Sequence, residues 1–210
     1  MPAVVIIYSA LSLLRGRMEE RRLLKIQNIF LLLASLQAFA QQEYKASRFG
    51  IKSNGVIDNT TSIQKAVDWI AEQGGGTLVF NVGRYLTGAV QLRSGVNIRL
   101  NEGAVIVGSA NIFTYKGCKG IFWGEGLENV VIFGRGVIDG QGAALKEDIA
   151  DKRAKGYLPE DVCVPSLLYL KDCKGIVLRN FIFRSPATPT LYVAEGTEVT
   201  EDGCYTDTPL

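Results

Sequence analysis

Histidine, a common catalytic residue, is absent from this chain of 210 residues. A Ser-His-Asp triad, a Cys-His dyad and the usual His-rich zinc site are therefore excluded within the sequence. The sequence contains 21 aspartate and glutamate residues. One of these, Asp139 in Ile-Asp-Gly-Gln-Gly, could face a binding groove or shape a turn by accepting backbone hydrogen bonds, and we favour the turn.

Four cysteines, Cys118, Cys163, Cys173 and Cys204, are the other reactive groups. Their spacings are irregular and match no metal-binding motif, and no clustered acidic site for calcium is visible. We therefore expect no metal and no cofactor. Four cysteines allow three disulfide pairings, but buried free thiols are the favoured interpretation.

The composition, with 47% hydrophobic and 21% charged residues, is that of a folded domain rather than a disordered chain. Five of the 23 basic residues and two of the 21 acidic residues precede Gln41, so the rest of the chain has a net charge near −1. This balance argues against nucleic acid as a partner. No run of about 20 apolar residues exists, so we expect no membrane span.

The first 40 residues have the layout of a processing segment. Residues 18–40 contain a basic stretch, an apolar run from Ile29 to Leu36 and the small-x-small tripeptide Ala38-Phe39-Ala40. This layout predicts a secretory signal peptide, and the alternative is an amphipathic or membrane-anchoring helix. We expect residues 1–17 to be a non-native upstream extension and residues 41–210 to form one domain, in a protein that is secreted or periplasmic.

One helix is predicted at the start of that domain. Thr61-Ser62-Ile63-Gln64 matches a capping box, and the apolar residues that follow recur at helical spacing: Ile63, Ala66, Val67 and Ile70. Gly74-Gly75-Gly76 ends the pattern. The overlapping triplet Asn59-Thr60-Thr61 is a glycosylation sequon, which matters only if the source organism glycosylates exported proteins.

After Gly76 the sequence consists of short apolar runs bounded by Gly, Asn or Asp, which predict strands. The predicted strands are Thr77–Phe80, Val96–Leu100, Ala104–Val107, Asn129–Phe133, Val137–Asp139, Ser166–Leu170, Ile176–Leu178, Phe181–Phe183, Leu191–Val193 and Glu198–Thr200. The corner residues Gly134, Asn180 and Gly203 are 46 and 23 residues apart, one interval twice the other. Repeated short strands with polar corners predict an all-β solenoid, a parallel β-helix.

Two segments interrupt the repeat and carry much of the charge. We expect Asn111–Lys119 and Gln141–Cys163 to be loops that emerge from the coils, one of them bordering the binding face. The capped helix is expected to cover the open first coil, which would otherwise expose strand edges and an apolar core.

Several segments, in their order along the chain, resemble one known family. They are Phe49–Thr60 (FGIKSNGVIDNT), Gly74–Phe80, Leu100–Ala104, Gly136–Gly142, Pro165–Leu168 and Phe181–Pro186. Together these residues are similar to the N-terminal half of the polygalacturonase-like glycoside hydrolases, family 28. The resemblance covers residues 48 to about 205. It implies a right-handed parallel β-helix with a groove on one face that hydrolyses pectic polysaccharides, polygalacturonate or rhamnogalacturonan, by an inverting mechanism with aspartate carboxylates.

The family's catalytic segments, Asn-Thr-Asp, Asp-Asp, Gly-His-Gly and Arg-Ile-Lys, do not occur in this sequence. We therefore expect a C-terminally truncated β-helix without catalytic residues, which is inactive by itself. Thr206-Asp207 falls one stretch too early for the family's first catalytic aspartate, so Asp207 is not assigned a catalytic role.

Arg184 and Tyr192 lie beside the coil where the family's groove would run. The resemblance makes them candidates for binding a carboxylated sugar, against the simpler alternatives of a solvated Arg184 and a packed Tyr192. We expect a monomer whose partner is pectic polysaccharide. Two other functions stay open: a non-catalytic carbohydrate-binding or adhesin-like β-helix, and a polysaccharide lyase on the same fold.

Overall fold

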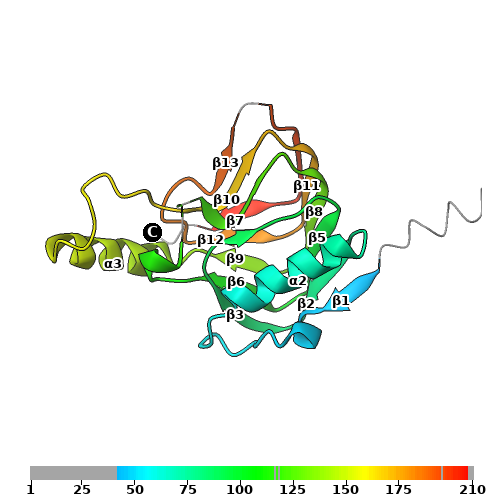
Figure 1. Ribbon diagram of the computed structural model, residues 1–210, viewed down its shortest axis with the longest axis horizontal. Helices are drawn as coiled ribbons and strands as arrows, with labels where there is room; N and C mark the ends of the chain where they lie inside the picture. Colours follow the sequence, from blue (N-terminus) through cyan, green and yellow to red (C-terminus); the bar gives the residue numbers. More distant parts are fainter. Residues whose placement is uncertain (1–41, 116, 118, 195, 208–210) are drawn as a thin grey trace, which may run out of the picture. The chain divides into compact units, whose positions relative to one another are not determined.

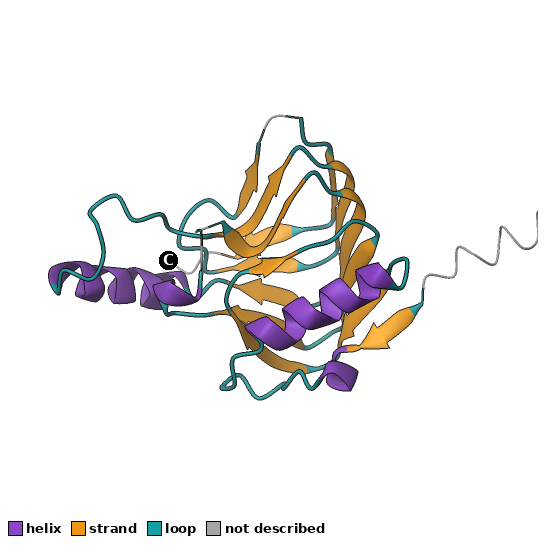
Figure 2. Ribbon diagram, viewed as in Figure 1, coloured by secondary structure: helices purple, strands orange, loops and turns teal. Residues whose placement is uncertain are grey.

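The computed structural model describes residues 42–207 except residues 116, 118 and 195. The segments predicted as an upstream extension (1–17) and a signal peptide (18–40) lie outside the described residues. In the described part, three sheets made only of parallel strand pairs wind around one core (Figures 1 and 2). No helix of the described part is long and apolar enough to cross a bilayer.

Each complete coil contributes one short strand to each sheet. Sheet A contains β1 (Glu43–Lys45), β2 (Gly76–Phe80), β5 (Val96–Leu100), β8 (Glu128–Gly134), β11 (Lys174–Arg179) and β14 (Val199–Asp202). Sheet B contains β3 (Gly83–Thr87), β6 (Ala104–Gly108), β9 (Val137–Asp139), β12 (Ile182–Arg184) and β15 (Tyr205–Asp207). Sheet C contains β4 (Val90–Gln91), β7 (Gly120–Glu125), β10 (Ser166–Lys171) and β13 (Leu191–Val193). The chain is thus a right-handed parallel β-helix, as predicted.

All ten predicted strands are present, with bounds that differ by at most two residues. The interpretation of the 46-residue interval changes, however. Ile132 pairs with Leu178, and Leu178 pairs with Glu201, so the intervals of 46 and 23 residues are each a single coil. The longer coil contains an insertion between β9 and β10. The polar corners are explained by backbone conformation: Asn180 and Gly203 both have positive φ, at 59° and 66°.

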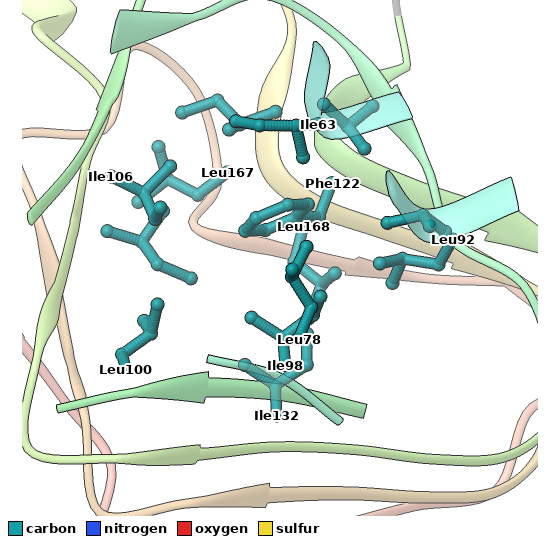
Figure 3. Close-up of a cluster of buried hydrophobic side chains, with 14 of the residues drawn as sticks. Ile63, Leu78, Leu92, Ile98, Leu100, Ile106, Phe122, Ile132, Leu167 and Leu168 are labelled. Carbon is teal, nitrogen blue, oxygen red and sulfur yellow. The ribbon is translucent and has the colours of Figure 1, made fainter. Parts of the chain in front are cut away.

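The core is built from columns of apolar side chains that repeat from coil to coil. Leu78, Ile98, Ile132 and Leu178 occupy one register position of sheet A, and all four are fully buried. Figure 3 shows three of these residues beside Phe122 and Leu168 from sheet C. Because each column spans successive coils, burial of any one coil depends on the coil before it and the coil after it.

The predicted helix is α2 (Thr60–Glu72), and it buries the four residues predicted for its apolar face: Ile63, Ala66, Val67 and Ile70. The capping box is wrong. The N-cap residue is Asn59, two residues before Thr61, and its side chain makes no capping hydrogen bond. The side chains of Thr60 and Gln64 bond to neighbouring strand segments instead, with the Gly88 N–H donating to Thr60 Oγ1 over 2.6 Å.

Backbone groups at the edges of the first coil are satisfied in three different ways. Strand β1 pairs with β2 on sheet A, and the segment from Ser53 to Asn59 bonds to β3 on sheet B. On sheet C, the Gln91 N–H donates to Gln64 Oε1 over 2.7 Å, and Gln64 Nε2 donates to the Gln91 carbonyl over 3.1 Å. The side-chain amide of Gln64 therefore takes the place of a further strand beside β4.

Asn59, the acceptor of the predicted glycosylation sequon, has only 1% of its surface exposed. Its Nδ2 group donates to the carbonyls of Lys52 and Ile57, and its Oδ1 accepts from the Lys52 N–H over 2.7 Å. The side chain therefore holds the segment before α2 in place. A glycan at this position is incompatible with the folded structure.

The segment Gln141–Cys163, expected to be a loop, contains a second helix, α3 (Gly142–Ala154). This expectation failed because α3 has little apolar periodicity: of its larger side chains, only Leu145 and Ile149 are buried. The helix instead carries two i,i+4 ion pairs, Asp148–Lys152 and Asp151–Lys155. Charge pairs at that spacing were the available helix signal in the sequence. The other expected loop, Asn111–Lys119, contains a short 3₁₀ helix, Ile112–Thr114.

The expectation that all four cysteines are free thiols is wrong for Cys163, which is disulfide-bonded. Cys173 and Cys204 are free, and Cys173 is fully buried. Burial raises the pKa of the Cys204 thiol. Cys118 lies outside the described residues.

Candidate functional site

A column of aromatic side chains lies on the outer face of sheet C. Trp123 pairs with Tyr169, and Tyr169 pairs with Tyr192, so the three residues occupy equivalent positions on β7, β10 and β13. We call these three residues the aromatic column. The rings of Tyr169 and Tyr192 stack nearly parallel, with an interplanar angle of 2° and centroids 4.8 Å apart. Their spacing is the strand spacing of the sheet, so the parallel register itself positions them.

The three residues alternate with core residues, as expected for strands. Phe122 and Leu168, which precede Trp123 and Tyr169, are fully buried, whereas Tyr192 is 47% exposed. The outer face thus presents ring edges and phenol hydroxyls to solvent. Flat apolar rings together with hydroxyl groups suit the binding of sugars, which have apolar faces and many hydroxyls.

A basic side chain lies against the first ring of the column. The Lys119 ammonium lies 4.0 Å from the centroid of the Trp123 ring and 2.9 Å from Glu125 Oε1. A cation–π contact and an ion pair therefore hold the ammonium beside the outer face. The ion pair is neutral overall, but the ammonium keeps further N–H donors that could bond to sugar oxygens.

The column ends in a cavity of about 550 Å³ between α2 and sheet C, which we call the α2 pocket. Its lining combines aromatic rings, hydroxyls, amides and one arginine, and includes Phe113, Trp123, Gln91, Arg93, Thr60 and Asp58. The Arg93 side chain is oriented by Asp68, whose Oδ1 accepts from Arg93 Nε over 2.7 Å and from Gln64 Nε2 over 3.1 Å.

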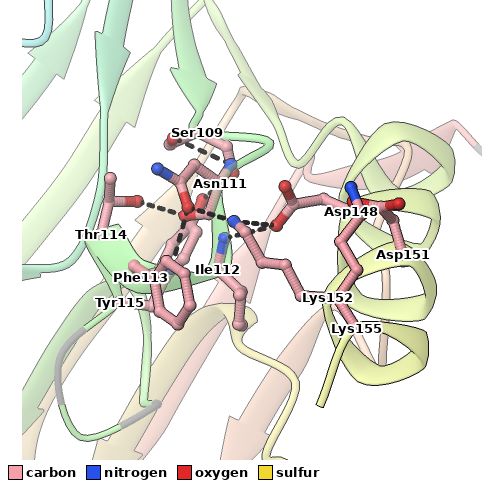
Figure 4. A network of polar contacts seen from close by, with 10 residues as sticks. All are labelled: Ser109, Asn111, Ile112, Phe113, Thr114, Tyr115, Asp148, Asp151, Lys152 and Lys155. Carbon is pink, nitrogen blue, oxygen red and sulfur yellow. Dashed lines mark hydrogen bonds and ion pairs between the residues drawn. The ribbon is translucent and has the colours of Figure 1, made fainter. Parts of the chain in front are cut away.

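The position of Phe113 at the pocket depends on α3. Asp148 Oδ2 accepts from the Ile112 N–H over 3.0 Å and from Lys152 Nζ over 2.7 Å, and Lys152 Nζ also donates to Asn111 Oδ1 over 2.6 Å (Figure 4). The same ammonium lies 4.3 Å from the centroid of the Phe113 ring. The charged insertion therefore positions a residue of the α2 pocket.

Arg184 and Tyr192, the two residues proposed from the sequence to bind substrate, lie on different sheets. Tyr192 belongs to the aromatic column on sheet C. Arg184 is on β12 of sheet B, where its Nε lies 3.3 Å from Asp207 Oδ2. Asp139 pairs with Arg184 in the register, and its Oδ1 accepts from the Gln141 N–H over 3.1 Å. That bond confirms the turn-shaping role favoured for Asp139.

Trp123, Tyr169 and Arg93 are candidate residues that the sequence reasoning missed. A signal for two of them was present, since Trp123, Tyr169 and Tyr192 are separated by the same intervals of 46 and 23 residues as the corner residues. Arg93 has no such signal, because its position depends on Asp68 of α2. Among the described residues, no group of three or more His, Cys, Asp or Glu side chains could hold a metal ion.

Tyr115, near Phe113 in the sequence, supplies a buried phenol behind the site. Its hydroxyl donates to the Ser109 carbonyl over 2.9 Å, and 4% of the residue is exposed. Burial raises the pKa of Tyr115 well above its ordinary value, and the charge of Asp58 raises it further, while the bond to Ser109 lowers it in part.

Comparison with solved structures shows which class of protein this chain resembles. A solved structure of a candidate glycosyl hydrolase from Parabacteroides merdae is 37% identical, with a TM-score of 0.77 over 79% of this chain and 75% of that chain. A family 28 exopolygalacturonase from Yersinia enterocolitica shares the fold at 20% identity, with a TM-score of 0.70 over 80% of this chain and 39% of that chain. No protein-family profile matches. The chain thus belongs to the family of the Parabacteroides merdae protein and shares the right-handed parallel β-helix fold of the exopolygalacturonase.

A characterised relative points to polygalacturonases among the glycoside hydrolases. The exo-poly-α-D-galacturonosidase of Dickeya chrysanthemi is 28% identical over 162 residues, which is 68% of this chain. The chain is therefore related to the polygalacturonase-like glycoside hydrolases of family 28. It spans 26% of the length of the Dickeya protein.

Proposed function

We propose that this chain is part of an enzyme that hydrolyses pectic polysaccharides, polygalacturonate or rhamnogalacturonan. The observation that carries the proposal is the 37% identity to the Parabacteroides merdae protein over three quarters of that chain. The name of the Dickeya relative supplies the substrate class. The aromatic column with Lys119 supports it independently, since rings, hydroxyls and ammonium N–H donors suit a sugar.

In this proposal the polysaccharide lies along the outer face of sheet C and crosses successive coils. Tyr192 contacts the sugar as predicted from the sequence, together with Tyr169 and Trp123. Arg184 stays a predicted second contact, although it lies on sheet B and its guanidinium is paired with Asp207 of the same sheet. Inverting hydrolysis needs one carboxylic acid to protonate the leaving oxygen and one carboxylate to activate water.

The role proposed for these 210 residues is substrate binding rather than bond cleavage. The family's catalytic motifs are absent from the sequence, which has no Asp-Asp pair and no histidine. We therefore propose that the chain by itself releases no reducing sugar from pectic substrates. The enzyme acts outside the cytoplasm, a proposal that rests on the signal-like pattern of residues 18–40 and is tested by N-terminal sequencing of the exported product.

Isothermal titration calorimetry with polygalacturonate and rhamnogalacturonan tests the proposal. We expect one of the two to bind, and Tyr192→Ala to weaken binding by a few-fold to about tenfold. Tyr205→Ala is the matched control, because Tyr205 is also exposed but lies on sheet B, in the next coil. Absence of binding to both polymers, or equal weakening by both variants, would contradict the proposal.

Product analysis separates the alternative functions. Release of unsaturated, ultraviolet-absorbing products would identify a polysaccharide lyase and overturn the hydrolase assignment. Release of saturated reducing ends by these 210 residues would support hydrolysis and contradict the proposed inactivity of the isolated chain.

A further inference from the structure

The α2 pocket contains an arginine, Arg93, whose side chain is fixed by Asp68, a residue that does not line the pocket. Asp68 of α2 accepts from Arg93 Nε and from Gln64 Nε2, and Gln64 in turn bonds to both backbone groups of Gln91. These hydrogen bonds fix the orientation of the Arg93 guanidinium group. Its two terminal nitrogens make no hydrogen bond or ion pair with any described residue.

An arginine held at Nε with both terminal nitrogens free is suited to a planar anion. The fork of a guanidinium matches the two oxygens of a carboxylate, and pre-orientation reduces the side-chain entropy lost on binding. Asp68 does not block the site, because it uses Nε and leaves the terminal nitrogens available. A carboxylate ligand is thus the anion that the Arg93 geometry favours.

The rest of the lining selects a sugar rather than a simple anion. Trp123 and Phe113 contribute rings, and Phe113 is 54% exposed. Asp58 also lines the pocket, and its Oδ1 accepts from the backbone N–H and the hydroxyl of Thr60. Its second oxygen is available to accept from a sugar hydroxyl. Apolar rings, a hydroxyl acceptor and a carboxylate partner together match the three kinds of surface on a uronic acid.

We propose that the α2 pocket binds one uronate unit of an acidic polysaccharide, with the sugar carboxylate on Arg93 and the pyranose ring against Trp123. The inference rests on the proposed function and adds a specific anchoring site at the end of the aromatic column. The site holds the chain and breaks no bond. Phe113, positioned by Lys152 of α3, forms one side of it.

Calorimetry of the 210-residue chain with trigalacturonate and with the neutral trisaccharide galactotriose tests the inference. We expect Arg93→Gln to weaken trigalacturonate binding by about 10- to 100-fold, because a charged hydrogen bond to a carboxylate is lost. Galactotriose binding should stay unchanged in the same variant. Added salt should weaken trigalacturonate binding to the unmodified chain and have little effect on the variant.

Arg99→Gln is the matched control. Arg99 lies on sheet A, is 39% exposed like Arg93, and is paired with one carboxylate at the same distance of 2.7 Å. We expect Arg99→Gln to leave trigalacturonate binding unchanged within about twofold, and circular dichroism to show both variants folded. Equal effects of the two substitutions would overturn the inference.

The outcomes distinguish this inference from the proposed function. If the unmodified chain binds trigalacturonate and Tyr192→Ala weakens that binding while Arg93→Gln does not, the pocket assignment is wrong and the proposed function stands. If the unmodified chain binds neither trigalacturonate nor polygalacturonate, both are overturned. If Arg93→Gln fails to fold, Arg93→Lys takes its place, because lysine keeps the charge but loses the fork and is expected to weaken binding by at least about fivefold.

Discussion

The inner and outer faces of sheet C are aligned by the same strand register, but their side chains have different environments. Its inner residues, Phe122 and Leu168, are fully buried, and the residues that follow them, Trp123 and Tyr169, lie on the outer face. Both pairs are aligned by the same parallel hydrogen bonds. The inner column is therefore expected to determine stability and the outer column to determine ligand binding. Substitutions on neighbouring positions can separate these roles, because they share a strand and differ only in the face they occupy.

The largest expected effect is loss of stability on the inner face. Leu168→Ala should lower the free energy of unfolding by about 3 kcal/mol, because it leaves a cavity between coils that cannot collapse. Urea denaturation followed by circular dichroism measures this change. Tyr169→Ala on the opposite face is the paired comparison, and a cost as large as that of Leu168→Ala would show that the outer column is part of the structural core.

The edge of sheet C provides a second, smaller test. Gln64→Ala removes both hydrogen bonds to the backbone of Gln91 and should destabilise the chain by about 1–2 kcal/mol in the same denaturation experiment. Lys65→Ala, on the exposed side of α2, should be nearly neutral and serves as the control. If the two variants are equally stable, the side chain of Gln64 does not close the sheet edge.

A pH titration tests the buried phenol behind the site. The pKa of Tyr115 is raised in the folded state, so its neutral form contributes stability that is complete below pH 10 and decreases above it, as the unfolded chain ionises first. This loss should reach about 1.4 kcal/mol at pH 11. Tyr115→Phe should have a correspondingly flatter stability profile between pH 9 and pH 11. Identical slopes for the two proteins would show that Tyr115 is solvated.

The smallest effect on stability is expected on the outer face. Tyr192→Ala should change the free energy of unfolding by less than about 1 kcal/mol, because Tyr192 is 47% exposed and loses mainly one stacking contact. Its effect on polygalacturonate binding should be larger than its effect on stability. A stability loss comparable with that of Leu168→Ala would remove the distinction between the two faces.

The sequence allowed prediction of those features of the fold that depend on residues close together in the chain. The apolar spacing of α2 and the polar corners at Asn180 and Gly203 are such features, since helical period and positive φ leave a direct record in residue type. Helix α3 was missed because it is held by charge pairs and two apolar residues rather than by an amphipathic face. The disulfide of Cys163 was missed because cysteine pairing depends on spatial proximity.

The site was less predictable than the fold. Tyr192 was proposed from the sequence, but recognising the column to which it belongs required knowing that 46 and 23 residues are each one coil. Arg93 could not be selected from the sequence, because its orientation comes from Asp68 on α2, 25 residues away. Arg184 and Tyr192 are only eight residues apart, yet the coil turns between them and places them on different sheets. Proximity in a solenoid follows coil register rather than sequence distance.

The central claim is that the outer face of sheet C, at Trp123, contacts an acidic polysaccharide. Trp69→Phe leaves Trp123 as the single tryptophan, because the chain contains two. Titration of that variant with polygalacturonate, followed by tryptophan fluorescence, should give a saturable change in Trp123 emission that disappears in high salt. Polygalacturonate binding that is detected by calorimetry without any change in Trp123 emission would contradict the claim.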